Sequence, residues 1–305
     1  MKCLLLGAGG RLGRELEKAL TARYDVRALG HAEADIADEA AISQLVERER
    51  PDVIVNAAAW TDVTGAQTHE KEAYAANALG VENLARAAKR FDTALLHYST
   101  DYVFSGEGDS PWRENDATAP LGVYGASKLA GERAFLLSGA RGAIVRVGWL
   151  HSGERDFIAA ILARALKGGT LSVVDNQWGT PSAADALARW TVSSMPGLLS
   201  TDGVRIVHYV ETGDYISRYQ MADYLLRRAE AHFEKRGDTQ GAALCRRAVE
   251  TMTRVTLMDG IRPANCRLAP TDAPDLASTE VWQEGVDKSV EKMISTFLPL
   301  WTSAS

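Results

Sequence analysis

Short apolar runs alternate with helical hydrophobic patterns along the first half of the chain. Each run is mostly aliphatic, and a segment with apolar residues three or four positions apart follows it, which is typical of parallel strands joined by helices. The expected strands are 3–6, 26–29, 53–58, 94–98 and 143–147. The expected helices are 14–21, 39–48, 70–89 and 123–137. This alternation predicts right-handed crossovers and an α/β fold, a doubly wound parallel sheet of the Rossmann type.

The pattern becomes less regular after Gly148. Helices are expected at 156–167, 184–194 and 218–237, strands at "LSVVD" and "VRIVHYV", and irregular structure at 259–278, which is rich in Pro, Asp and Ala. We therefore predict a dinucleotide-binding domain over 1–150 and a smaller, mainly substrate-binding lobe over 151–305. The strand near 204–210 is expected to return to the sheet of the first domain.

Composition and charge narrow the classes of partner. The 305 residues carry 24% charged side chains and a formal net charge of -6, without a basic stripe, so nucleic acid is not an expected partner. No apolar stretch approaches the roughly 20 residues that a membrane span needs, so no membrane partner is expected either. Cys3, Cys245 and Cys266 do not have metal-ligand spacing. They indicate a reducing compartment, which we take to be the cytoplasm, and we predict no metal site.

A glycine-rich turn, "GAGGRLG", follows the first expected strand and opens the first expected helix. Gly7 allows a tight turn, Gly10 allows a pyrophosphate to approach the backbone, and Gly13 allows the helix to pack closely on the strand. The helix N-terminus offers N–H groups and a partial positive charge to phosphate. A plain strand–helix turn is the alternative, but the position and spacing favour a dinucleotide site.

The end of the second expected strand bears on the choice of cofactor. NAD sites usually have an acidic residue there, whereas this chain has Gly30 followed by His31. Arg11 in the glycine turn could pair with a 2'-phosphate, although it could equally point into water. NADP(H) is therefore favoured, with NAD(H) as the alternative.

Further cofactor contacts are expected along the same edge of the sheet. Asp35 and Ile36 could contact the adenine, and the small residues of "NAAAWT" at the end of the third strand could let a ligand lie against the backbone or simply pack a helix. The cofactor-binding candidates are Gly7, Gly10, Arg11, Leu12, Gly13, Asp35, Ile36, Ala57, Ala58, Ala59, Thr61, Tyr124 and Lys128.

Tyr124 and Lys128 are four residues apart on an expected helix and therefore share one face. A nearby ammonium, together with an oxidised nicotinamide, is expected to lower the pKa of the tyrosine. Thr100, in "STD" after the fourth strand, could donate its hydroxyl to the same substrate oxygen. The three side chains would make a proton donor beside a hydride donor. A packed tyrosine with a lysine reaching to solvent is the alternative.

Longer stretches of the chain resemble the extended short-chain dehydrogenase/reductase family, in particular its reductases of dTDP-4-dehydrorhamnose. They are "GAGGRLGRELEKAL", "RPDVIVNAAAWTDV", "NALGVENLARAA", "HYSTDYVFSGEGDSPWRENDATAPLGVYGASKLAGE" and "VRVGWLH", with weaker matches in "VVDNQWGTPSAA" and "RPANCRL". The resemblance implies that Thr100, Tyr124 and Lys128 are catalytic and that Asn77 helps to order a relay water. It also implies that Tyr102, Val103, Trp149, Arg262 and Asn265 bind the substrate.

The implied reaction is reduction of the C4 ketone of dTDP-4-dehydro-L-rhamnose to dTDP-L-rhamnose, with hydride from a nicotinamide and a proton from Tyr124. Trp112 is a candidate stacking surface in the polar loop before Tyr124. The sequence departs from the family pattern at "DVTGAQ", at Gly30 and over 234–261. Glu15 matches an acidic position at which some relatives bind a metal between protomers, but no partner ligands can be placed.

Two other functions stay open. A non-catalytic NADP-binding regulatory subunit, like that of methionine adenosyltransferase, resembles the same reductases, although the intact Thr100, Tyr124 and Lys128 favour catalysis. A reductase or epimerase of another nucleotide sugar is the other alternative. The predicted partner is a small nucleotide sugar, and a homodimer is left open.

Overall fold

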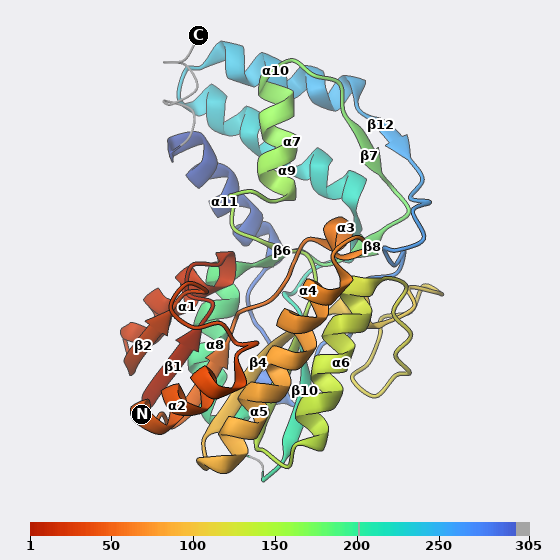
Figure 1. Cartoon of the computed structure of the whole chain (residues 1–305). Coiled ribbons are helices and arrows are strands. Elements are labelled where there is room, and N and C mark those ends of the chain that lie inside the picture. Colours follow the sequence, from red (N-terminus) through yellow and green to blue (C-terminus); the bar gives the residue numbers. More distant parts are fainter. Residues whose placement is uncertain (201, 297–305) are drawn as a thin grey trace. The chain divides into compact units, whose positions relative to one another are not determined.

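The computed structural model describes residues 1–200 and 202–296 (Figure 1). The chain divides into two compact units. The first comprises Met1–Gly148, Ala184–Val210 and Asp259–Ser278, and the second comprises Trp149–Ala183, Glu211–Met258 and Thr279–Ser305.

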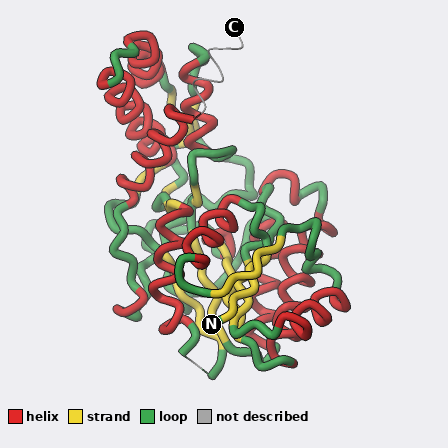
Figure 2. Tube along the Cα trace, turned by 90° about the vertical axis from the view of Figure 1, so that its left-hand side faces the viewer, coloured by secondary structure: helices red, strands yellow, loops and turns green. Residues whose placement is uncertain are grey.

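The first unit contains a six-stranded parallel sheet in the order β10-β5-β4-β3-β1-β2. Figure 2 shows its strands in yellow with red helices around them. The strands are β1 (Lys2–Leu6), β2 (Asp25–Leu29), β3 (Val53–Asn56), β4 (Ala94–Thr100), β5 (Gly142–Val147) and β10 (Val204–Tyr209). β10 pairs with β5, so the expected return of the "VRIVHYV" strand to this sheet is observed. The order reverses between β1 and β3, which is where open parallel sheets bind their ligands.

Helices cover both faces of this sheet. α1 (Arg11–Thr21) packs against α8 (Ala184–Leu198), while α2 (Glu39–Glu49), α5 (Gly80–Arg90) and α6 (Val123–Leu137) pack side by side. Leu4, Leu6, Ile54 and Leu95 on the strands are fully buried in the core formed with α2 and α5. A strand buried on both faces needs a nearly continuous apolar sequence, which explains the short aliphatic runs.

The expected helix 70–89 is three elements in the structure: α4 (Glu70–Tyr74), the π-helical turn η1 (Ala75–Leu79) and α5. Two short elements complete this side of the unit, α3 (Val63–Ala66) and the 3-10 turn η2 (Asp101–Val103). The hydrophobic period did not reveal the π turn because it changes the register by a single residue. Such turns occur frequently at functional sites, and this one contains Asn77.

Two segments beyond residue 150 belong to the first unit. They are Ala184–Val210, whose strand β10 was expected to return there while its helix α8 was not, and Asp259–Ser278, whose helical part is the 3-10 turn η3 (Pro274–Leu276). The Asp259–Ser278 segment is held by backbone hydrogen bonds between Trp112 and Arg267 and between Ala269 and Trp112. It is irregular, as expected from its composition, but long-range bonds fix its place.

The second unit is mainly helical, with α7 (Phe157–Leu166), α9 (Arg218–Lys235), α10 (Thr239–Thr251) and α11 (Trp282–Thr296). Its short strands form pairs: β6 (Leu150–His151) with β9 (Ser182–Ala183), β7 (Ser172–Val174) with β12 (Thr253–Val255), and β8 (Trp178–Gly179) with β11 (Ile216–Ser217). α9 and α10 pack closely together, so the extra helical character of 234–261 is a second helix laid on α9. Among the described residues, no helix is both long and apolar enough to cross a membrane.

Candidate active site

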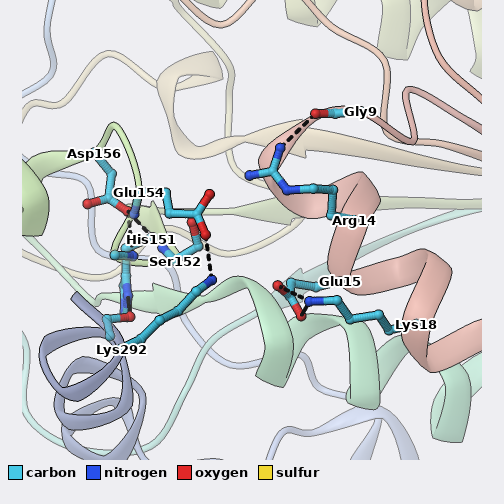
Figure 3. A network of polar contacts seen from close by, with 11 residues as sticks. Gly9, Arg14, Glu15, Lys18, His151, Ser152, Glu154, Asp156 and Lys292 are labelled. Atoms are coloured by element: carbon cyan, nitrogen blue, oxygen red, sulfur yellow. Dashed lines mark hydrogen bonds and ion pairs between the residues drawn. The ribbon is translucent and has the colours of Figure 1, made fainter. Parts of the chain in front are cut away.

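The glycine turn has the geometry that its spacing predicts. Gly7 has a φ of 78°, and a Cβ there would lie 2.5 Å from the backbone nitrogen of Ala58. A Cβ at Gly13 would overlap the carbonyl oxygen of Gly7, so both positions require glycine. Gly10 is the N-cap of α1 and has no side chain to cover the helix N-terminus. Arg14 braces the turn by donating to the Gly9 carbonyl over 2.8 Å (Figure 3).

A cavity of about 670 Å³ lies over this turn. Its wall contains the predicted residues Gly7, Gly10, Asp35, Ile36, Ala57, Ala58 and Ala59, together with Gly9, His31, Ala37, Trp60, Glu72, Ala75 and Ala76, which the sequence did not indicate. A Cβ at Gly9 would meet nothing within 4 Å, so the backbone faces open space here. A glycine backbone at a helix N-terminus, facing a cavity of this size, fits a dinucleotide.

The other cofactor candidates lie beside the cavity. The side chain of Leu12 is buried in the core, so only its backbone could contact a phosphate. Gly13 is buried where α1 packs on the turn. Arg11 is half-buried and Thr61 is exposed.

Gly30 follows the end of β2, as the sequence predicted, but a carboxylate lies beside it. The chain turns back after Gly30, and the Glu33 carboxylate accepts a hydrogen bond from the Gly30 N–H over 3.0 Å. The Glu33 N–H in turn donates to the Gly30 carbonyl over 3.1 Å. An acidic group from three residues further along the chain thus lies beside the end of β2, although Glu33 is exposed and is not part of the cavity wall.

Tyr124 and Thr100 are brought together, as predicted. Their hydroxyls share a hydrogen bond. Thr100 also donates to the Asp101 carboxylate over 2.8 Å and accepts from the Tyr102 N–H over 3.2 Å. Thr100 ends β4, and Tyr124 lies in the first turn of α6, so the pair is at the carboxyl edge of the sheet.

Within the chain itself the pKa of Tyr124 is raised, and the lowering expected beside an oxidised nicotinamide stays a prediction. Burial raises it to about 12, the Asp101 carboxylate adds to the rise, and the hydrogen bond with Thr100 opposes it. A buried phenol beside a carboxylate keeps its proton. That is the protonation state required of a group that donates a proton to a ketone.

Lys128 lies one helical turn from Tyr124 and is 2% exposed. Its ammonium donates to the Tyr98 carbonyl over 2.6 Å, and its Nζ is 3.3 Å from Nε2 of His97. Burial lowers the pKa of Lys128 to about 8, against the opposing effect of Glu132. The alternative of a lysine reaching to solvent is therefore excluded, because the side chain points into the protein.

Two side chains from distant segments hold the start of α6. The α6 N-cap, Gly122, has no side chain, and the side-chain oxygen of Gln67 accepts from the Val123 N–H over 2.7 Å instead. Gln67 belongs to the "DVTGAQ" stretch that departs from the family pattern. Asn77 bonds both backbone groups of Trp60 and donates to the Ser127 hydroxyl over 3.0 Å. The Asn77 side chain thus braces α6 against the loop after β3.

A buried ion pair lies under the same helix. The Arg146 guanidinium on β5 binds the Glu132 carboxylate on α6 with two hydrogen bonds of 3.0 and 2.7 Å, and both side chains are at most 3% exposed. Arg146 also donates to the Glu114 carbonyl over 3.1 Å. Two parallel bonds fix orientation as well as distance, so the pair holds α6 in register with the sheet.

The predicted substrate contacts have different environments. Tyr102 packs edge-on against the Tyr124 ring, with centroids 5.7 Å apart. Val103 is fully buried in a cluster with Phe104 and Leu129, and its contact with the sugar stays a prediction. Trp149 belongs to the second unit, where the Arg218 guanidinium stacks 3.7 Å from its ring, and its contact with substrate stays a prediction.

The remaining candidates hold loops of the first unit together. Asn265 is 2% exposed, and its side chain donates to the Glu107 and Ser110 carbonyls. Its contact with substrate stays a prediction. Trp112 is half-buried and stacks one face on Phe104 at 4.8 Å, and its role as a stacking surface stays a prediction.

Arg262 is the more accessible of the two C-terminal candidates. It pairs with Asp259 and donates to Thr64 over 2.7 Å, with 32% of its side chain exposed. Its contact with substrate also stays a prediction.

Among the described residues, no group of three or more His, Cys, Asp or Glu side chains could hold a metal ion. The Glu15 carboxylate is paired with Lys18 at 3.0 Å (Figure 3). Cys3, Cys245 and Cys266 are buried free thiols, and burial raises the pKa of Cys3 to about 11 and that of Cys245 to about 12. Thiols in such surroundings are inert.

The family model for the RmlD substrate binding domain matches residues 1–295. The chain belongs to this family. The dTDP-4-dehydrorhamnose reductase of Salmonella typhimurium is 35% identical over 304 residues, covering 97% of this chain and 99% of that protein. The resemblance to reductases of dTDP-4-dehydrorhamnose is therefore confirmed over nearly the whole chain.

Solved structures agree with the sequence comparison. A dTDP-4-dehydrorhamnose reductase from Clostridium acetobutylicum superposes with a TM-score of 0.81 at 27% identity, covering 95% of this chain and 99% of that one. The enzyme of the same name from Bacillus anthracis, in complex with NADP, also has a TM-score of 0.81, at 26% identity and the same coverage. The predicted fold class is confirmed.

Proposed function

We propose that this RmlD-family protein reduces the C4 ketone of dTDP-4-dehydro-L-rhamnose to dTDP-L-rhamnose. The observation that carries the proposal is the hydrogen-bonded pair of Tyr124 and Thr100, one helical turn from buried Lys128 and on the same sheet edge as the glycine-lined cavity. A relative of nearly the same length carries the name of this reaction.

The chain's own residues account for the proton part of the reaction. Tyr124 holds its proton at neutral pH because its pKa is about 12, and it donates that proton to the ketone oxygen. Thr100 orients the phenol, and its side chain is itself fixed by Asp101. A reduced nicotinamide, when bound, supplies the hydride to C4. Lys128 and His97, one helical turn away and on β4, are themselves buried.

NADP(H) is the favoured cofactor, and NAD(H) is the alternative. The glycine turn and the cavity fit either dinucleotide, and the Bacillus anthracis relative was solved with NADP. Arg11 would favour a 2'-phosphate, whereas Glu33 would favour a free ribose hydroxyl. The two groups act in opposite directions, so we expect both cofactors to be used, with NADPH preferred.

The test is a turnover assay with the purified chain. NADPH absorbance should fall when dTDP-4-dehydro-L-rhamnose is added, and the product should have the mass of dTDP-L-rhamnose. Consumption of NADPH only with another nucleotide sugar would reassign the substrate. A lack of consumption with every nucleotide sugar, in a protein that still binds NADPH, would favour the regulatory-subunit alternative. A protein purified with a tightly held dinucleotide would favour an epimerase.

The proposal places the enzyme in the cytoplasm, where its three buried thiols would stay reduced. A homodimer stays a prediction, and light scattering of the purified chain would check it.

A further inference from the structure

A continuous line of polar contacts joins the wall of the glycine-lined cavity to Lys128. The Ala58 N–H donates to Oδ1 of Asn56 over 3.0 Å. Nδ2 of Asn56 lies 3.0 Å from Nδ1 of His97, and Nε2 of His97 lies 3.3 Å from Nζ of Lys128. Asn56 and His97 are register partners on β3 and β4, and neither is accessible to solvent.

The backbone N–H of Ala58 determines which atoms along this line carry a proton. Oδ1 of Asn56 must face the Ala58 N–H, because a backbone donor needs an acceptor, and the Asn56 NH₂ therefore faces His97. An amide NH₂ only donates, so Nδ1 of His97 accepts. Burial holds the pKa of His97 well below its usual value, and the proximity of Lys128 lowers it further. The ring is thus neutral, with its single proton on Nε2.

Lys128 consequently faces a donor rather than an acceptor. An ammonium has no lone pair, so protonated Lys128 and the Nε2–H of His97 oppose each other across 3.3 Å. A neutral amine has a lone pair and can accept that N–H while still donating to the Tyr98 carbonyl. The arrangement therefore favours the neutral lysine over the charged one.

The other charged groups around Lys128 do not reverse this preference. Glu132, on the next turn of α6, favours the ammonium, but its carboxylate is bound by Arg146 of β5. Tyr124, on the preceding turn of α6, is neutral. Asp101 of η2 acts on Tyr124. Asn77 of η1 has no charge.

We propose that Asn56 and His97 are positioning residues that lower the proton affinity of Lys128 by presenting it with an N–H donor. The inference deepens the proposed function and, for its catalytic meaning, rests on it. Each turnover leaves Tyr124 as a phenolate, which must regain one proton. A Lys128 of lowered proton affinity, one turn away on the same face of α6, gives one proton to the phenolate. The resulting amine accepts the Nε2–H of His97, and a proton taken up from water restores the ammonium.

The tautomer of His97 can be read directly in the unaltered protein. Nitrogen-15 NMR of histidine-labelled protein should show His97 neutral, with the proton on Nε2, and the signal should be assigned by its loss in His97→Phe. A proton on Nδ1 would overturn the proposal, because Nε2 would then offer Lys128 a lone pair. This measurement needs no turnover and no folded variant other than the one used for assignment, and His97→Gln can replace that one.

The second measurement is the pKa of Lys128, from NMR of protein with labelled lysine, assigned with Lys128→Met. His97→Phe removes the N–H donor and should raise the pKa by about one unit or more. His97→Gln can accept from Asn56 and donate to Lys128, so it should keep the pKa near the original value. Tyr98→Phe, a control at the adjacent buried position, should leave it unchanged. A folded His97→Phe protein with an unchanged Lys128 pKa would overturn the proposal.

The pH profile of turnover separates positioning from mere packing. In His97→Phe, the alkaline limb of the plot of kcat against pH should move to higher pH, as the Lys128 pKa does. In His97→Gln, this limb should return to its original position. A uniform loss of kcat at every pH, without movement of the limb, would mean that His97 only fills space. If no nucleotide sugar is turned over at all, the proposed function fails, while the two NMR measurements still decide the role of His97.

Discussion

Two parts of one sheet edge can be compared directly, since both lie in the first unit. The glycine end comprises the turn from Gly7 to Gly13 and the wall at Ala57 and Ala58, and it is made of backbone with little side chain. The tyrosine end comprises Thr100, Tyr124 and Lys128, and it is made of buried polar side chains with displaced pKa values.

The difference shows two ways in which a protein can prepare a site. At the glycine end, specificity comes from the open space over the glycine backbone. The N–H groups of the helix N-terminus face this space and fit phosphate groups through their fixed dipoles. At the tyrosine end, reactivity comes from desolvation, which moves the pKa of Tyr124 up and that of Lys128 down. Substitutions at the first should therefore alter binding and folding, and substitutions at the second should alter chemistry and its dependence on pH.

The largest effect is expected from removing the phenol oxygen. Tyr124→Phe should lower kcat by roughly 10³-fold or more, because a positioned proton donor contributes about 10²–10⁴-fold and Thr100 would lose its partner. The dissociation constant of NADPH, measured by fluorescence titration, should change little. A loss of kcat together with an equal loss of NADPH affinity would show that Tyr124 stabilises the structure of the tyrosine end and does not donate the proton.

At the glycine end, Gly7→Ala should mainly affect folding. A Cβ at φ 78° is strained, and it would lie 2.5 Å from the Ala58 nitrogen, so we expect a loss of roughly 3 kcal/mol in the free energy of unfolding. Gly9→Ala is the matched control, because its Cβ meets nothing within 4 Å. Urea denaturation of both variants checks this, and equal stabilities would contradict the assigned geometry.

The buried lysine gives the tyrosine end a distinctive pH dependence. The folded-state pKa of Lys128 is about 8, below the ordinary 10.5, so between these values the unfolded chain binds more protons. Stability should therefore rise with pH across this window, by roughly 3 kcal/mol for a shift of this size. Below pH 8 the cost of burying the ammonium is fully present.

The free energy of unfolding of the unaltered protein minus that of Lys128→Met isolates this effect, because the other groups titrate equally in both proteins. Urea denaturation at pH 7.5–10.5, with pH set at roughly half-unit steps, would measure it. A difference that stays flat with pH would mean that Lys128 has an ordinary pKa in the folded protein.

The smallest effect concerns cofactor preference at the glycine end. Arg11→Ala should weaken NADPH binding by roughly tenfold while leaving NADH binding nearly unchanged, as expected for loss of one charge-assisted contact to a phosphate. Glu33→Gln should act in the opposite direction and favour NADPH. Titrations of both variants with both cofactors would check these predictions. Equal changes in NADPH and NADH affinity would show that the residue does not contact the 2'-group of the adenosine ribose.

Local pattern was sufficient for much of the fold. The helix 123–137 was expected with the bounds that the structure has, and the five early strands were expected within one or two residues at nearly every end. The clearest failure was the break at η1, where one extra residue in a turn hardly alters the hydrophobic period. The loops were also harder. The polar loop did not reveal that Trp112 would stack on Phe104, and the motif of Asn265 did not reveal that its side chain would hold another loop, because neither shows which segment it will pack against.

The sequence by itself determined the parallel sheet, the glycine turn and the shared face of Tyr124 and Lys128, because each depends on spacing within a few residues. Only the tertiary structure decided that Glu33 returns to the end of β2, that Gln67 caps α6, and that Asn56 and His97 lie behind Lys128. The contact of Gln67 with α6 and the line from Asn56 to Lys128 join residues more than thirty positions apart. Strand register and burial set them, and neither can be read from the neighbours of a residue in the chain.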